Sequence, residues 1–215
     1  MKKVGRAWLT VVVALTTVLA LSACGSSSKM TGSDAKKYAQ SVLDASYKGE
    51  FTEYMKQTDC TKDEAEEMYN KGIDSTMDAS GLDDTDVSDE LKEEYRQLFI
   101  DIYKSADYTL DDAKEDGEDG FTIDVKIKPF TLFNGMEEEL QTAVQEKAAA
   151  MSELTDAEVD ELVYQTMYDL LSAKLENLEY GDETTVTLHV KPDDEGVYYI
   201  PDDDLEAVES ALVPQ

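Results

Sequence analysis

The sequence has 215 residues and carries 49 acidic against 19 basic side chains, a formal net charge of −30. Its hydrophobic content of 41% is too high for a wholly disordered chain, and its length fits one compact domain. So negative a chain is repelled by phosphate backbones and by anionic lipid headgroups, so we expect neither nucleic-acid binding nor electrostatic adsorption to a membrane. The negative charge is compatible with binding of cations or of basic partners.

The N-terminal segment has the pattern of an export signal. Lys2, Lys3 and Arg6 form a positive region, and the 15 residues 7–21 that follow are uncharged and mostly apolar. A membrane-spanning helix needs roughly 20 predominantly apolar residues, and the polar residues 25–29 come soon after this run. The segment therefore predicts a signal peptide in preference to a permanent span.

The signal ends in Leu21-Ser22-Ala23-Cys24, which resembles the lipobox of bacterial lipoproteins. The resemblance implies a signal peptide over residues 1–23, a diacylglyceryl group on the thiol of Cys24, and cleavage just before it. It further implies palmitate-type acyl chains that hold the protein on the extracytoplasmic face of the cell membrane, because two or three chains anchor stably. The alternative is ordinary secretory cleavage after Ser22 or Ala23.

Cleavage before Cys24 would leave 192 residues, and the loss of three basic side chains would change the net charge from −30 to −33. Residues 24–32 are then expected to form a flexible tether that spans about 30 Å at full extension. The rest, residues 33–213, is expected to form a single domain. Cys60 would be a lone second cysteine, so the fold would have no intramolecular disulfide.

Three amphipathic helices are predicted before the first strand. The first begins near Ser33, the second at the capping box of Thr61 and Glu64, and the third at Ser88. A short helical turn at 51–55 is expected between the first two. Each helix has one apolar face, so each needs a packing partner.

Alternation with period two then predicts two hairpins with a helical segment between them. In the first hairpin, 108–110 and 121–127 flank a turn at 116–120, and in the second, 186–190 and 197–200 flank a turn at 192–196. Helical spacing returns between the hairpins, where Thr155 and Glu158 form another capping box, and again near the C-terminus. The apolar residues expected on these later helices are Leu140, Val144, Ala148, Met151, Val159, Leu162, Val163, Met167, Leu170, Leu171, Leu175, Leu178, Leu205, Val208 and Leu212.

The expected order is three helices, a hairpin, two helices, a hairpin and a helix. Joining both hairpins gives an α+β fold with a single four-stranded antiparallel sheet covered on its apolar side by amphipathic helices. The element order and the final strand, with its Asp-Glu-Gly-Val-Tyr-Tyr-Ile sequence at 194–200, are similar to small bacterial lipoproteins with cystatin-like or nuclear-transport-factor-like sheets. This resemblance implies a fold and no reaction.

The acidic runs do not match a metal site. Counted from Asp84, an EF-hand loop would need a glycine where Asp89 stands and a glutamate where Tyr95 stands. After cleavage His189 and Cys60 are the available imidazole and extra thiol, which is too few for structural zinc. We expect no metal and no cofactor, and we interpret the runs as solvated surface, with calcium-stabilised adhesion as an alternative.

Catalytic motifs give little support for an enzyme. The sequence has no Gly-x-Ser-x-Gly elbow and no glycine-rich phosphate loop. A pair of carboxylates could hydrolyse an envelope polymer, but 49 carboxylates always allow some pair at a workable spacing. We therefore name no catalytic residue.

One group of cations stands out because basic residues are few. Lys126, Lys128, His189 and Lys191 all fall on the outward face of two predicted strands. If the strands are neighbours, these side chains form a cationic patch that could bind a carboxylate or phosphate, or an acidic helix of the same chain. The alternative is that they protect a sheet edge or pair with nearby acids.

The sequence thus favours a lipid-anchored extracytoplasmic protein whose domain binds a partner protein, an envelope component or a small ligand without catalysis. A carboxylate-based envelope hydrolase and a transporter-associated binding lipoprotein are the alternatives. Transporter-associated binding proteins commonly need two lobes, so a single sheet would argue against the second. The oligomeric state does not follow from the pattern.

Overall fold

A computed structural model describes residues 29–82, 85–117, 119–151 and 154–214. Its helices are α1 (Gly32–Leu43), the π-helical turn η1 (Asp44–Lys48), α2 (Phe51–Thr58), α3 (Lys62–Ser80), α4 (Asp89–Lys104), α5 (Met136–Met151), α6 (Asp156–Glu176) and α7 (Asp202–Leu212). Its strands are β1 (Asp107–Leu110), β2 (Lys114–Asp116), β3 (Gly120–Lys128), β4 (Thr184–Pro192) and β5 (Tyr198–Tyr199).

Local capping fixes where several helices begin. The side chain of Thr61 accepts a hydrogen bond from the backbone of Glu64 at 3.3 Å, and the Glu64 carboxylate accepts one from the backbone of Thr61 at 2.8 Å. The same reciprocal arrangement starts α6 at Thr155, and the side chain of Ser88 caps α4. These predicted starts are confirmed because each cap satisfies amides that the first helical turn leaves unpaired.

The sheet has the predicted antiparallel core. Its strand order is β1-β3-β4-β5, so the two hairpins join through β3 and β4, and β2 pairs with the other end of β3 beside β1. The register sets Ile123 opposite Leu188 and Val125 opposite Val186, so the apolar positions of both strands share one face. The α+β class with one antiparallel sheet is therefore confirmed, with β2 as an additional short strand.

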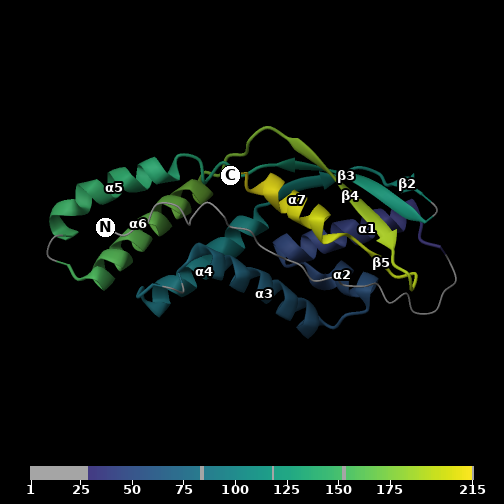
Figure 1. Cartoon of the computed structure of the whole chain (residues 1–215), viewed down its shortest axis with the longest axis horizontal. Coiled ribbons are helices and arrows are strands. Elements are labelled where there is room, and N and C mark those ends of the chain that lie inside the picture. Colours follow the sequence, from purple (N-terminus) through teal and green to yellow (C-terminus); the bar gives the residue numbers. More distant parts are fainter. Residues whose placement is uncertain (1–28, 83–84, 118, 152–153, 215) are drawn as a thin grey trace.

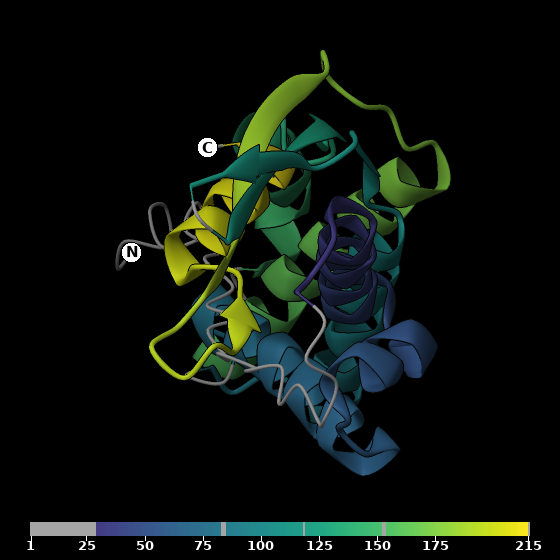
Figure 2. The same ribbon diagram turned by 90° about the vertical axis from the view of Figure 1, so that its right-hand side faces the viewer.

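The helices form successive layers on the apolar side of the sheet (Figures 1 and 2). Helices α1 and α7 contact β3 and β4 directly, whereas α3 and α4 pack against η1. Ile123, Val125, Ile127, Leu188 and Val190 are fully buried beneath them. The helices therefore cover the apolar face of the sheet, and the polar face lies on the side away from them.

Helices α5 and α6 form a hairpin that projects from the body, and we call this hairpin the arm (Figure 1). Helix α6 packs against α4, while α5 packs mainly against α6. The arm and the short strand β2 lie at opposite ends of the long axis of the molecule (Figure 1). Much of the arm therefore has no second helix or sheet to cover it.

Candidate functional site

The predicted cationic patch lies on the polar face of the sheet, as its alternation indicated. Lys126 and Lys128 are on β3, and His189 and Lys191 are on β4. The register places His189 opposite Thr122, four residues along β3 from Lys126, a separation of about 13 Å in an extended strand. The four side chains share a face, but His189 and Lys126 do not converge on one point.

The two lysines on β3 are paired with acidic residues of the neighbouring chain segment. Lys126 Nζ donates a hydrogen bond to Asp111 at 2.7 Å, and Lys128 Nζ donates one to Asp107 at 2.7 Å. These hydrogen bonds raise the pKa of both lysines. Exposed pairs of this kind contribute little stability, but they occupy the charges that an anionic ligand would need.

The two cations on β4 also have partners within the chain. The Asp204 carboxylate accepts a hydrogen bond from the backbone N–H of His189 at 2.7 Å and lies 2.9 Å from its ring Nδ1. Lys191 Nζ sits 5.5 Å from the centre of the Tyr199 ring. The geometry therefore supports a structural use of all four residues, and anion binding by the patch remains a prediction.

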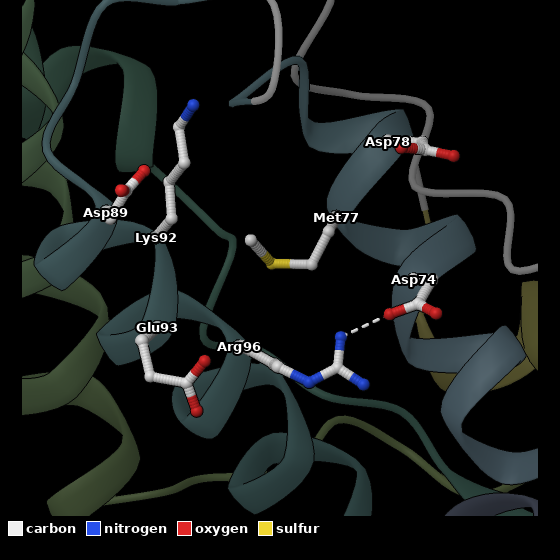
Figure 3. Close-up of a pocket in the computed structure, with 7 residues that line it drawn as sticks. All are labelled: Asp74, Met77, Asp78, Asp89, Lys92, Glu93 and Arg96. Atoms are coloured by element: carbon white, nitrogen blue, oxygen red, sulfur yellow. Dashed lines mark hydrogen bonds and ion pairs between the residues drawn. The ribbon is translucent and has the colours of Figure 1, made fainter. Parts of the chain in front are cut away.

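A groove lies between α3 and α4 (Figure 3). It has a volume of about 380 Å³, and Met77 points from α3 across it towards α4. Arg96 forms an ion pair with Asp74 on the facing helix and donates to Asn70 at 3.3 Å. The residues that line the groove are Asp74, Met77, Asp78, Asp89, Lys92, Glu93 and Arg96.

The lining of the groove is mostly charged. Four carboxylates and two cations surround a single methionine, so its lining is polar with an excess of negative charge. Among the described residues, no group of three histidine, cysteine, aspartate or glutamate side chains could hold a metal ion. Glu209 is the buried carboxylate of the described chain, and it lines neither the groove nor the hollow around α2. Nothing in the groove thus resembles the buried acid of a hydrolase.

The first half of α6 is fixed to α4 by specific hydrogen bonds. The Glu161 carboxylate of α6 accepts from the backbone N–H and the hydroxyl of Ser88, each at 2.7 Å. Ser88 immediately precedes Asp89, which lines the groove. The hydroxyl of buried Tyr95 on α4 donates to the backbone carbonyl of Tyr164 at 2.7 Å. Helix α6 is therefore attached to the start of α4, next to one of the residues that line the groove.

The first turns of α6 carry apolar side chains that remain half-buried. Leu171 and Met167, near the body, are buried, whereas Val159, Leu162 and Val163 in the first turns of α6 stay partly exposed. Val144 on α5 is partly exposed as well. Two packed helices leave part of their apolar stripes in solvent where no third element covers them.

The second hollow surrounds α2 and is larger, with a volume of about 1140 Å³. Its apolar lining comes from Phe51, Met55 and the half-exposed free thiol residue Cys60. Asp44, in the π-helical turn, borders it and accepts hydrogen bonds from Gln40, Lys48 and Tyr108 at 2.8 to 2.9 Å. The other residues that line it are Ser41, Gly49, Glu50, Thr52, Glu53, Lys56, Asp59, Lys62 and Glu66.

The sequence identified the apolar residues of α6 but did not indicate which of them would stay partly exposed. Periodicity shows that a helix has an apolar face, but it does not show whether a second element covers that face. The π-helical turn beside the α2 hollow had no sequence signal at all. Cys24, the predicted lipidation site, lies outside the described residues.

Comparisons with known proteins show the fold and little else. No protein-family model matches the chain, and no curated protein matches it. Among solved structures, the crystal structure of a "putative lipoprotein (ycdA)" from Bacillus subtilis strain 168 aligns with a TM-score of 0.61 at 16% identity. The alignment covers 85% of this chain and 56% of that chain, so this protein spans little more than half of its neighbour's length.

The class that this evidence defines is an α+β domain with one antiparallel sheet, shared with that neighbour. Within the described ranges, no helix combines the length and apolar character needed to cross a bilayer. The similarity to cystatin-like and nuclear-transport-factor-like sheets stays a prediction.

Proposed function

We propose that the protein is a lipoprotein anchored through Cys24 on the extracytoplasmic face of the cell membrane, and that its domain binds a partner protein without catalysis. The lipobox at residues 21–24, behind a charged and then apolar segment, supports the anchor. The shared fold with a Bacillus subtilis protein described as a lipoprotein is consistent with it. The arm and the adjoining α3–α4 groove form the binding surface of this proposal.

The observation that carries the binding function is the half-buried apolar surface of the arm. Full burial of a valine or leucine side chain lowers the free energy by about 1.5–3 kcal/mol relative to full exposure. Val159, Leu162 and Val163 keep part of that surface in solvent, so a partner that covers all three would gain on the order of 2–4 kcal/mol from them. Such a cluster fits the apolar centre of a protein interface with a polar rim.

The negative charge of the domain favours a basic partner. The chain after cleavage would carry a net charge of −33, and the groove beside the arm has more carboxylates than cations. A basic surface on the partner would be attracted to this side of the domain, which raises the association rate most strongly at low ionic strength. The proposed partner is therefore a protein with an apolar patch inside a basic rim.

The anchor is tested by metabolic labelling with an alkyne fatty acid, followed by membrane fractionation. We expect Cys24→Ser to remove the label and to release the protein from the membrane. The matched control is Cys60→Ser, which removes the other cysteine of the predicted mature chain and should leave both properties unchanged. A label that survives in Cys24→Ser would contradict the lipobox assignment.

The binding surface is tested by a photo-crosslinking amino acid placed at Leu162 in intact cells. We expect a discrete adduct that disappears when Val159→Glu is added on the same helix face. Thr187, which is exposed on the polar face of the sheet, provides the matched control for both the crosslinker and the glutamate substitution. Equal adducts from the two positions, or an adduct that tolerates Val159→Glu, would refute the arm as the binding surface.

The α2 hollow supports a second candidate, a small cationic ligand. Its volume of about 1140 Å³ lies slightly above the range of ordinary ligand pockets, and carboxylates surround its apolar residues Phe51 and Met55. An organic amine such as spermidine should raise the melting temperature, and the paired change Glu50→Gln with Glu66→Gln should abolish the shift. No shift at millimolar amine would remove this candidate.

The remaining alternatives receive less support. A transporter-associated binding lipoprotein is expected to have two lobes, whereas the described strands form a single sheet. A carboxylate-based hydrolase would need a buried acid in a hollow, and Glu209 is instead surrounded by core residues such as Tyr47 and Tyr103. Partner binding is therefore the function that the geometry favours.

A further inference from the structure

The described chain begins at one end of the molecule, where its first residues contact β2 and β3. Lys29 forms an ion pair with Asp119, which directly precedes β3. Met30 packs against the main core. The segment predicted as a tether, residues 24–32, is thus held against the domain from Lys29 onward, and its remaining residues lie outside the described chain.

Helix α1 holds the start of the described chain in place more firmly than the ion pair of Lys29 does. Ala35, Ala39 and Leu43 are fully buried, so the helix cannot leave the domain without opening the core. At its start, Gly32 lies so close to Ala113 that an added Cβ would be 3.4 Å from the Ala113 carbonyl oxygen. Lys36, one turn further along, bonds Asp112 at 2.8 Å. The chain therefore always leaves the domain beside β2.

The length of chain between this point and the predicted lipid is short. Cys24 precedes Lys29 by five residues, which reach about 17 Å at full extension. A Debye length at physiological ionic strength is about 8 Å, so the tether is just long enough to hold an acidic domain outside the strongest repulsion of an anionic membrane. It is too short for the domain to move far from the bilayer.

The arm lies at the opposite end of the molecule from this exit point. Figure 1 shows β2 and the start of α1 at one end of the long axis and the tip of α5 and α6 at the other, and Figure 2 views the exit end directly. The 21 residues of α6 alone span about 32 Å. Any orientation that the tether permits keeps β2 near the lipid, whereas the arm can extend well away from it.

We infer that the end of the domain formed by the start of α1, β2 and the start of β3 is its membrane-proximal surface, and that the arm is presented on the membrane-distal side. This inference rests on the lipid anchor of the proposed function. The short tether therefore keeps this end of the domain near the lipid and leaves the arm as the end that can lie far from it. A partner would meet the arm from the side facing away from the lipid bilayer.

The test measures energy transfer from a single tryptophan to dansyl-labelled lipid headgroups. The chain from Cys24 onward contains no tryptophan, so Glu115→Trp on β2 and Gln141→Trp on α5 each introduce a unique probe at an exposed position. In a Cys60→Ser background, the Cys24 thiol is coupled to maleimide lipid in vesicles. We expect transfer from position 115 to exceed that from position 141 several-fold. Equal or reversed transfer would overturn the inference.

A longer tether provides the control. Ten glycine and serine residues inserted after Ser28 would more than double the reach of the chain, so transfer from position 115 should fall towards the value at position 141. Unchanged transfer from position 115 would also contradict the inference. Chemical coupling does not depend on cellular lipidation, so a negative fatty-acid labelling result would refute the proposed anchor without altering the measured orientation.

Discussion

The buried hydroxyl of Tyr95 offers a sharp test of how the arm is attached to the body. Tyr95 is fully buried on α4, and its hydroxyl donates to the Tyr164 carbonyl of α6 at 2.7 Å. Burial raises the pKa of this hydroxyl, so it stays a donor at every physiological pH. Tyr95→Phe removes the hydrogen bond but keeps the ring, whose centre lies 5.6 Å from that of Tyr168 and 6.0 Å from that of Phe99.

The expected cost is that of one buried hydrogen bond, about 1–1.5 kcal/mol in the free energy of unfolding. For a domain of this size, that corresponds to a fall of about 2–6 °C in melting temperature. Urea denaturation gives the free energy, and hydrogen exchange should show faster exchange in α6 than in β3. Tyr199→Phe, on half-buried β5, is the matched control and should change neither. A destabilised Tyr95→Phe protein in which the exchange of α6 is unaltered would refute the proposed role at the arm.

Three further substitutions test the fold. Gly49→Ala should lower the free energy of unfolding by about 1–2 kcal/mol in urea denaturation, because Gly49 has φ +67°, a left-handed conformation that a side chain disfavours. Ile123→Ala, at a fully buried position of β3, should cost about 3–4 kcal/mol in the same assay, and a cost below 1 kcal/mol would contradict its central place. Burial raises the pKa of Tyr38 from 10.0 to about 12, so this group contributes stability that is complete below pH 10 and is lost as pH rises to 12. Tyr38→Phe should therefore flatten the alkaline part of a stability-against-pH curve, and an unchanged curve would count against the burial of that hydroxyl.

The central sheet could be predicted because its signals are local and repeated. Alternation along Phe121, Ile123, Val125 and Ile127 assigned the buried face of β3, and all four side chains are buried. The short strand β2 could not be predicted in the same way. Its Lys-Glu-Asp sequence has no apolar alternation and low strand propensity, and it is extended because it pairs with β3 across a tight turn.

The cationic patch shows a different limit of sequence reasoning. Alternation correctly placed Lys126 and His189 on the polar face, because side chains alternate along any strand. Their partners could not be inferred, since Asp111 follows the neighbouring strand and Asp204 lies on the closing helix. Whether a charge is free depends on these tertiary contacts, which leave no periodic mark in the sequence.

The arm and the N-terminal segment together connect the fold to the proposed function. Acidic side chains also line the α2 hollow elsewhere on the surface, so charge favours a basic partner but does not by itself select the arm. Apolar exposure is more selective, because Val159, Leu162 and Val163 are partly exposed together in the first turns of α6. The chain leaves the domain at the opposite end, so a five-residue tether would hold that end near the lipid and leave the apolar cluster accessible. A domain anchored at its other end would present the same cluster towards the membrane, and the two tryptophan probes distinguish these arrangements by the distance of each end from the lipid.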